Sequence, residues 1–160
     1  MEKVHKLIQI LRDRKLTVSF AESCTGGQLS AFITEQPGVS DIFLGSVVTY
    51  SNEAKVELLG VSRETLIEEG AVSENTARQM AQGAQKKLKS EFSVAITGVA
   101  GPTGGSKLKP VGTVCFAVSG MNLVMSQTAR FSGNRKEIQV QACEFAMQFL
   151  TETIKQQFPK

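Results

Sequence analysis

The sequence predicts an α/β protein, a three-layer α/β/α sandwich around a mixed, mostly parallel sheet. Two observations predict this class. Short apolar segments of period two alternate with segments whose apolar residues recur every three or four positions. The last two strand segments follow each other across a short turn, so a hairpin should supply the antiparallel part of the sheet. We expect one domain over residues 1–160, because a chain of 160 residues can enclose one substantial core.

The first half of the chain should contain three helices and two strands. Apolar residues at positions 4, 7, 8 and 11 give one apolar face to the first helix. Pro37-Gly38 breaks the chain, and Ser51 and Gly60 are good caps for a short helix. The predicted elements are helix 2–14, a strand through Leu16, Val18 and Phe20 ending near Ser23, a helix opening at Gly26-Gly27, strand Phe43–Tyr50 and helix Asn52–Leu59.

The second half should contain three helices and three strands. Ser62 and Gly70 bracket a short helix, and Ser73 caps a longer one whose apolar stripe runs to Leu88. A glycine-rich loop, GVAGPTGGSKLKPVG, follows the next strand. The remaining predicted elements are strand Phe92–Thr97, the hairpin of Thr113–Val118 and Leu123–Phe131, and a last helix beginning near Asn134.

Composition argues against several classes of partner. The net charge is only +3, and the densest basic cluster (Lys86, Lys87 and Lys89) closes a helix, where cations complement the helix dipole. With no Trp and one Tyr there is no stacking platform, so we expect no nucleic-acid partner. No apolar run approaches the roughly 20 residues of a membrane span, and the charged N-terminus is not a secretory signal. We expect no membrane partner and a cytoplasmic location.

The cysteines and the single histidine do not indicate a metal site. Cys24, Cys115 and Cys143 are widely spaced and show no zinc-type grouping. His5 has no second ligand near it in the sequence, and we expect it at the surface. Cys115 and Cys143 lie in apolar segments and should be reduced core residues. We therefore expect chemistry without a metal or an organic cofactor.

Three notable stretches should meet in space. Ser23–Gly27, Tyr50–Lys55 and Gly98–Gly105 each follow a predicted strand. Ligands of open α/β sheets gather beyond the carboxyl ends of the strands, so we expect these loops to converge on a binding site.

Ser23 is a candidate nucleophile at the point where a strand meets a helix. Unpaired N–H groups at the helix start could stabilise an oxyanion, and Gly26 and Gly27 would let a substrate approach the backbone. Taken alone, the local sequence favours a plainer role, in which Ser23 or Thr25 only caps the helix. Cys24 is a competing nucleophile, although adjacent side chains of a strand point in opposite directions.

Lys55 is the candidate general base. His5 is remote from every glycine loop in the sequence, and Glu22 should point to the face opposite Ser23. Lys55 would occupy the fourth position of its helix, where the dipole disfavours a cation by only about 0.3–1 kcal/mol. Burial would have to supply the rest of any useful fall in its pKa, and a solvated lysine is the alternative. Tyr50 could orient a substrate, relay a proton or simply be half-buried.

The glycine loop and Arg135 are candidate anion binders. Exposed amides of Gly98–Gly105 could hold a phosphate or carboxylate, and Arg135 begins the last helix with its fork of donors. The loop matches neither GxGxxG nor the P-loop, so nucleotide-dependent phosphoryl transfer is not indicated. A mobile connection and an exposed arginine are the alternatives.

Six motifs together resemble the CinA C-terminal domain family over residues 2–155. In order along the chain they are AESCTGG, VTYSNEAK, GAVS, ITGVAGPTGG, KPVGTV and FSGNR. Characterised members of that family are nicotinamide-nucleotide amidases (NMN deamidases) of pyridine nucleotide salvage. The resemblance implies hydrolysis of the carboxamide of nicotinamide mononucleotide to nicotinate mononucleotide and ammonia.

The resemblance also assigns roles to residues. It implies Ser23 as nucleophile, Lys55 as base and Tyr50 as their catalytic neighbour, and it reverses the preference for plain structural roles of Ser23 and Lys55. The substrate-binding residues that we expect are Thr25, Gly26, Gly27, Thr97, Gly98, Gly101 and Arg135. The expected partner is a mononucleotide substrate. We also expect a homo-oligomer, although the sequence does not show the oligomeric state.

The sequence departs from the family pattern at Leu44-Gly45-Ser46. Family members often carry a polar residue at the position of Leu44, which bears on substrate affinity and specificity. This departure supports the alternative function, a catalytically silent nucleotide-binding or regulatory protein linked to competence or DNA damage. Longer relatives also carry an N-terminal molybdopterin-binding-like domain with pyrophosphatase activity, which we do not expect here.

Overall fold

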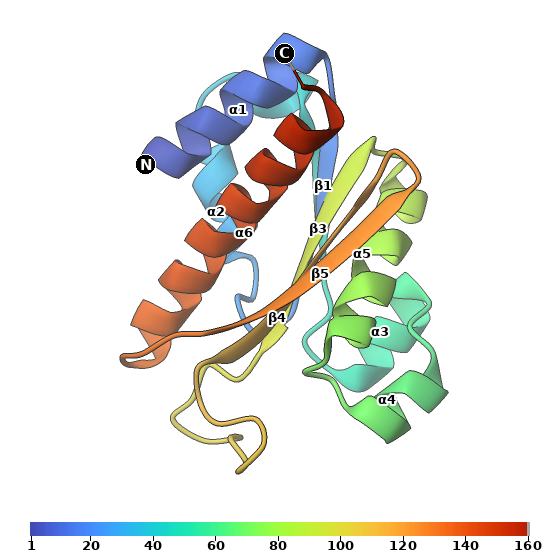
Figure 1. Cartoon of the computed structure of the whole chain (residues 1–160), viewed down its shortest axis with the longest axis vertical. Coiled ribbons are helices and arrows are strands. Elements are labelled where there is room, and N and C mark those ends of the chain that lie inside the picture. The colour runs from blue at the N-terminus through green and yellow to red at the C-terminus, as the bar shows by residue number, and fades with distance from the viewer. Residues whose placement is uncertain (160) are drawn as a thin grey trace.

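A five-stranded sheet lies between two groups of helices in the computed structural model, which describes residues 1–159 (Figure 1). The α/β sandwich predicted from the sequence is therefore confirmed. The strands are β1 (Val18–Glu22), β2 (Phe43–Val48), β3 (Phe92–Gly98), β4 (Thr113–Gly120) and β5 (Leu123–Arg130).

The sheet has the strand order β2-β1-β3-β4-β5. β1 pairs in parallel with β2 and β3, whereas β4 pairs antiparallel with β3 and β5. Only β4 runs against the others, so the sheet is mixed and mostly parallel as predicted. Met121 and Asn122 join β4 to β5 with φ values of 53° and 60°, the conformation that a tight two-residue hairpin loop requires.

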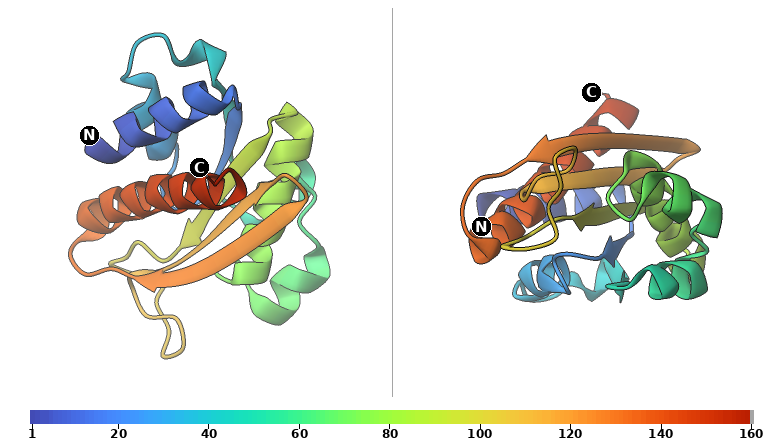
Figure 2. Two further views of the ribbon diagram at one scale, coloured as in Figure 1. Left: turned by 45° about the horizontal axis from the view of Figure 1, so that its top comes forward. Right: turned by 90° about the horizontal axis from the view of Figure 1, so that it is seen from below.

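The helices form two layers, one on each face of the sheet (Figures 1 and 2). The first layer consists of α1 (Glu2–Arg14), α2 (Gln28–Thr34) and α6 (Arg135–Gln157). The second consists of α3 (Asn52–Leu59), α4 (Arg63–Glu69) and α5 (Glu74–Leu88), and a 3-10 turn over Val39–Asp41 precedes β2. Within residues 1–159, every helix is too short or too polar to cross a bilayer.

The two faces of the sheet carry side chains of different size. In β1, Phe20 packs into the core beneath α1, α2 and α6, whereas Ala21 faces the core beneath α5. The same alternation follows β3, where Val94 and Ile96 lie on the first face and Ala95 on the second. Because successive side chains of a strand point to opposite faces, small residues on one face let α5 lie close to the sheet.

Close packing also fixes α3 against α5. A Cβ atom at Gly83 of α5 would lie 2.0 Å from the carbonyl oxygen of Leu59, so only glycine fits there. Gly60 ends α3 with a φ of 69°, which confirms the predicted cap. The C-terminal end of α3 is therefore fixed against α5. Lys55, a residue of α3, is buried in the interior.

β1 begins two residues later than predicted, and β4 ends two residues later, at Gly120. The end of β2 also differs from its prediction. The strand ends at Val48, two residues before the predicted end at Tyr50. Val48 pairs with Glu22, the last residue of β1, so no neighbouring strand remains beyond it. Thr49 and Tyr50 instead connect β2 to Ser51, which caps α3 through a hydrogen bond from the Ala54 amide.

Candidate active site

The three stretches that follow β1, β2 and β3 meet around one cavity of about 330 Å³. This confirms the convergence that was predicted from strand order alone. Small-molecule sites typically enclose about 300–1,000 Å³, so the cavity is large enough for a small ligand. Its lining consists of Ser23, Cys24, Tyr50, Lys55, Ala71, Val72, Thr97, Gly98, Val99, Ala100, Gly101, Thr103, Gly104 and Arg135.

Lys55 reaches this cavity from α3 while its side chain stays buried, with 1% of the residue exposed. Its Nζ donates to Ser23 Oγ at 2.9 Å and to the carbonyl oxygen of Thr49 at 2.8 Å. Burial lowers the pKa of Lys55 from 10.5 to about 8. The alternative interpretation of Lys55 as a solvated surface lysine is therefore excluded. Near pH 8 a sizeable fraction of its amine is neutral.

The Thr49 carbonyl sets the direction of the proton transfer that Lys55 can perform. A carbonyl oxygen can only accept, so Thr49 must take an N–H of the amine. A neutral amine has one lone pair, and the other close partner of Nζ is Ser23 Oγ. The lone pair can therefore accept the Ser23 proton, which is the arrangement that a general base requires.

Ser23 lies in the turn between β1 and α2 and does not cap α2. The residue is 7% exposed, and its amide donates to the carbonyl oxygen of Ile96 in β3. Gly27 is the N-cap and makes no side-chain cap bond. The first free amides of α2, Leu29 and Ser30, instead donate to the carboxylate of Glu22. The interpretation of Ser23 or Thr25 as the cap is therefore wrong, because a buried carboxylate from the preceding strand fills that role.

The amides of the turn are only partly available for an oxyanion. The Gly26 amide donates to the Ser23 carbonyl, so it is already used. Within residues 1–159, the amides of Cys24, Thr25 and Gly27 have no acceptor in another residue, and of these three only Cys24 borders the cavity. Not every amide from Cys24 to Gly27 can therefore donate to an oxyanion, because the Gly26 amide is hydrogen-bonded within the turn.

Cys24 is a poor nucleophile in this site although it borders the cavity. It is 6% exposed, and burial raises the pKa of its thiol to about 12. The thiol is thus almost wholly protonated near neutral pH, which favours Ser23 as nucleophile. Cys115 and Cys143 are buried and reduced as predicted, and burial raises the pKa of both.

Arg135 connects two of the converging loops at the mouth of the cavity. One terminal nitrogen donates to the Gly101 carbonyl at 2.7 Å, and the other donates to the Tyr50 hydroxyl at 2.7 Å. Tyr50 is 62% exposed, and among residues 1–159 its hydroxyl is hydrogen-bonded to Arg135 and to neither Ser23 nor Lys55. Tyr50 thus holds the guanidinium in place, and its predicted part in proton transfer stays a prediction.

The glycine loop forms the opposite wall. The Thr97 hydroxyl donates to the Ala71 carbonyl at 2.7 Å, which ties the segment before α5 to the end of β3. Gly98 lies against Val114, where a Cβ atom would come within 2.8 Å of a methyl group. Thr97, Gly98 and Gly101 all border the cavity, in agreement with their predicted place in the site.

Thr25, Gly26 and Gly27 do not border the cavity. The Thr25 hydroxyl is buried and donates to Glu22 at 2.8 Å. Gly26 and Gly27 adopt φ values of 57° and 107°, which shape the turn. The geometry gives these three residues a structural role, so it does not support the substrate contacts that we predicted for them.

Sequence reasoning overlooked some residues of the site. Ala71 and Val72 border the cavity, and the Gln139 side chain donates to the Cys24 carbonyl at 2.9 Å. Gln139 lies four residues after Arg135 and so on the same face of α6, a spacing that could have indicated it. Ala71 and Val72 belong to the GAVS motif. This motif contributed to the family resemblance, but the sequence analysis assigned no function to its residues.

Two predicted features lie outside the cavity. His5 is exposed on α1 and contacts Gln36, which agrees with its predicted surface position. Leu44 is exposed on β2, and Ser46 donates to Glu22 inside the protein. The departure from the family pattern at Leu44-Gly45-Ser46 thus does not alter the wall of the cavity.

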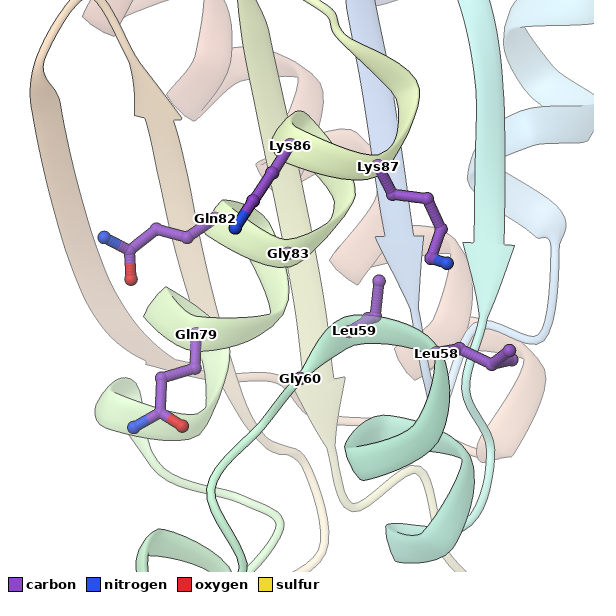
Figure 3. A pocket seen from close by; sticks show the side chains of 8 residues that line it. All are labelled: Leu58, Leu59, Gly60, Gln79, Gln82, Gly83, Lys86 and Lys87. Atoms are coloured by element: carbon purple, nitrogen blue, oxygen red, sulfur yellow. The ribbon is translucent and has the colours of Figure 1, made fainter.

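A larger hollow elsewhere on the protein lacks such chemistry. It is an open groove of about 700 Å³ between the end of α3 and the outer face of α5 (Figure 3). Figure 3 shows Gln82, Lys86 and Lys87 projecting from α5 beside Leu58 and Gly60 of the neighbouring segment. The groove offers no nucleophile and no buried titratable group, so the smaller cavity is the better candidate.

The chain has an α/β fold with a buried serine–lysine pair at the carboxyl ends of its strands. A sequence-family profile, the CinA C-terminal domain, matches residues 1–154. The chain belongs to this family.

Relatives of known sequence and structure agree with this assignment. A CinA-like protein of Fervidobacterium nodosum is 50% identical over 154 residues, which make up 96% of this chain and 38% of that protein. This chain therefore spans well under half of that relative. A crystal structure of a competence/damage inducible protein from Agrobacterium tumefaciens is 41% identical with a TM-score of 0.92, covering 96% of this chain and 94% of that one. A CinA superfamily protein from Klebsiella pneumoniae is 36% identical with a TM-score of 0.93, covering 97% of both chains.

Proposed function

We propose that this protein hydrolyses the carboxamide of nicotinamide mononucleotide, releasing nicotinate mononucleotide and ammonia. The observation that carries the proposal is the 2.9 Å contact between Ser23 Oγ and the buried Nζ of Lys55 at the wall of a cavity. Hydrolysis of an amide needs a nucleophile, a base that accepts its proton and a donor set for the oxyanion. Ser23 and Lys55 are the proposed nucleophile and base, and the Cys24 amide at the cavity wall is the proposed oxyanion donor.

The proposed reaction has two stages. Neutral Lys55 accepts the Ser23 proton as Ser23 Oγ bonds to the amide carbon, and the Cys24 amide at the wall of the cavity is the donor left for the oxyanion. The carbon–nitrogen bond then breaks, and ammonia leaves with the proton that Lys55 returns. In the second stage Lys55 takes a proton from water as the water oxygen bonds to the acyl carbon. The ester bond to Ser23 Oγ then breaks, Lys55 returns the proton to Ser23 Oγ, and the carboxylic acid product loses its proton to solvent.

The phosphate of the substrate should lie at the mouth of the cavity. Arg135 is held there on two neutral oxygens, from Tyr50 and Gly101, which a doubly charged phosphate can replace with stronger hydrogen bonds. Arg135 is also the first residue of α6, a helix of 23 residues whose N-terminal dipole favours an anion. These features support a phosphorylated substrate over free nicotinamide.

A direct test measures ammonia release from nicotinamide mononucleotide by the native protein and by Ser23→Ala. Nicotinamide riboside, which lacks only the phosphate, is the matched substrate control. We expect release from the mononucleotide by the native protein alone, and weak release from the riboside. Equal release by Ser23→Ala, or none by either protein, would overturn the proposal.

The alternative function is a catalytically silent nucleotide-binding or regulatory protein. The names of the relatives refer to competence and damage. The sequence argument for a protein without catalytic activity depended on Leu44, which lies away from the cavity. Binding of the mononucleotide in titration calorimetry without ammonia release would favour this alternative. Assembly as a homo-oligomer is a separate proposal, which sedimentation velocity of the purified protein tests.

A further inference from the structure

Glu22, the residue directly before Ser23, is completely buried and accepts five hydrogen bonds. Its partners all lie in the turn, in α2 or in β2. They are Thr25 Oγ1 at 2.8 Å, the Leu29 amide at 2.8 Å, the Ser30 amide at 3.2 Å, Ser30 Oγ at 2.6 Å and Ser46 Oγ at 3.2 Å. Every donor is neutral, so the carboxylate is stabilised by hydrogen bonds alone.

These contacts add side-chain restraints to a turn whose backbone is held by the Ile96 carbonyl and the Gln139 side chain. Gly26 and Gly27 have positive φ and no side chain that could fix the path of the chain. Thr25 is tied to one carboxylate oxygen of Glu22, and the start of α2 is tied to both oxygens. The position of Ser23, which lies between Glu22 and Thr25, is therefore set from both sides.

The backbone of Glu22 connects to the other member of the pair. Its carbonyl oxygen accepts the Thr49 amide at 2.8 Å, and the Thr49 carbonyl in turn accepts Lys55 Nζ at 2.8 Å. Glu22 thus holds the nucleophile through its side chain and the segment that orients the base through its main chain. A shift of this residue would change the distance between Ser23 Oγ and Lys55 Nζ.

A direct role of Glu22 in proton transfer does not fit the geometry. Glu22 does not border the cavity, and Ser23 is not among its five donors. Both oxygens are already engaged, so the carboxylate has little capacity left to accept a substrate proton.

We infer that Glu22 is a positioning residue, whose carboxylate holds the Ser23–Thr25 turn where Ser23 lies within hydrogen-bond distance of Lys55. This inference rests on the proposed amidase function. Misplacing a catalytic group by about 1 Å can lower turnover about 100-fold without touching substrate contacts. Loss of the Glu22 contacts should therefore lower kcat and leave KM nearly unchanged.

Three variants separate positioning from proton transfer. Thr25→Val removes one hydrogen bond without changing shape, and we expect kcat to fall about tenfold. Glu22→Ala removes all five, and we expect a fall of about 100-fold. Glu22→Gln keeps one oxygen for Thr25 and Leu29, and its NH₂ group can donate to the serine hydroxyls, so kcat should recover to within about tenfold of native. KM and the pH midpoint of activity should stay unchanged throughout.

Glu91→Gln is the matched control. Glu91 also accepts a backbone amide and a hydroxyl, both from Thr17, and it lies just before β3, at the end of the strand away from the cavity. We expect its kcat and KM to remain within about twofold of native. Native-like kcat in Thr25→Val and Glu22→Ala, or Glu22→Gln as inactive as Glu22→Ala, would overturn the inference.

A crystal structure of Thr25→Val separates this inference from the proposed function. If native protein releases no ammonia, the proposed amidase function is wrong. The distance between Ser23 Oγ and Lys55 Nζ in the Thr25→Val structure still tests the role of Glu22. We expect the two atoms to lie beyond hydrogen-bond distance in the variant. An unchanged separation of 2.9 Å would overturn the inference, and the same structure decides the question if Glu22→Ala does not fold.

Discussion

Lys55 Nζ lies 2.9 Å from Ser23 Oγ, although the two residues are 32 positions apart and Lys55 is almost fully enclosed. An amine in that environment is poorly solvated as a cation, and its pKa falls to about 8. The contact thus combines the two properties that a general base for a serine needs, which are reach and a partly neutral state.

Lys55→Met should abolish most turnover, because it removes the proton acceptor and keeps the length of the side chain. General bases typically contribute about 100- to 10,000-fold, and we expect kcat for ammonia release to fall within that range. Lys86→Met is the control, since Lys86 is an exposed lysine of the groove in Figure 3. Equal losses in the two variants would contradict the assignment of the base.

The activity should rise with pH and level off above about pH 8. The active form of Lys55 is the neutral amine, whose fraction increases as pH approaches the pKa of about 8 from below. Two units below that pKa, kcat/KM should be about 100-fold under its plateau. Initial rates from pH 5.5 to 9.5 measure this limb, and a flat profile below pH 8 would exclude Lys55 as the titrating base.

Cys24→Ala should keep activity within about threefold of native. Burial holds the pKa of the Cys24 thiol at about 12, so a thiolate is scarce at working pH. The change also leaves the carbonyl that accepts the Gln139 side chain. Parallel assays of Cys24→Ala and Ser23→Ala decide between the two nucleophiles, and loss of activity in the cysteine variant alone would favour the thiol.

Arg135→Lys should raise KM for the mononucleotide about 10- to 100-fold with little change in kcat. A lysine cannot donate to two phosphate oxygens with the fixed fork of a guanidinium, and such charged hydrogen bonds contribute about 1.5–3 kcal/mol. Tyr50→Phe removes a hydroxyl that the phosphate is proposed to replace on Arg135, so it should change KM much less than Arg135→Lys does. Steady-state kinetics with nicotinamide riboside provide the control, since neither change should alter its KM appreciably.

Gly83→Ala should destabilise the protein and also lower its activity. The added methyl group would meet the Leu59 carbonyl at 2.0 Å, so α3 must move. Overpacking costs about 1–3 kcal/mol, which exceeds the roughly 1 kcal/mol that alanine gains over glycine in a helix. Urea unfolding measures the loss, and Gln82→Ala on the exposed face should change stability by less than about 0.5 kcal/mol. Unchanged stability and turnover in Gly83→Ala would show that α3 tolerates the shift.

The sequence by itself determined the elements, their order and most of their ends. Ser51, Ser62, Ser73 and Asn134 each cap a helix through an amide three residues later, as their positions in the sequence predict. Such signals are readable because the interacting groups are neighbours in the chain. The order of strands and helices likewise predicted where the three loops meet, since parallel strands end at one edge.

Only the tertiary structure decided how the site works. The burial of Lys55, the choice of Ser23 over Cys24 and the capping of α2 by Glu22 depend on groups brought together from distant positions. Desolvation depends on everything packed around a group, and a window of sequence does not contain that information. Lys55, which the sequence alone also allowed to be solvated, is buried and contacts Ser23 and the Thr49 carbonyl only in the folded chain.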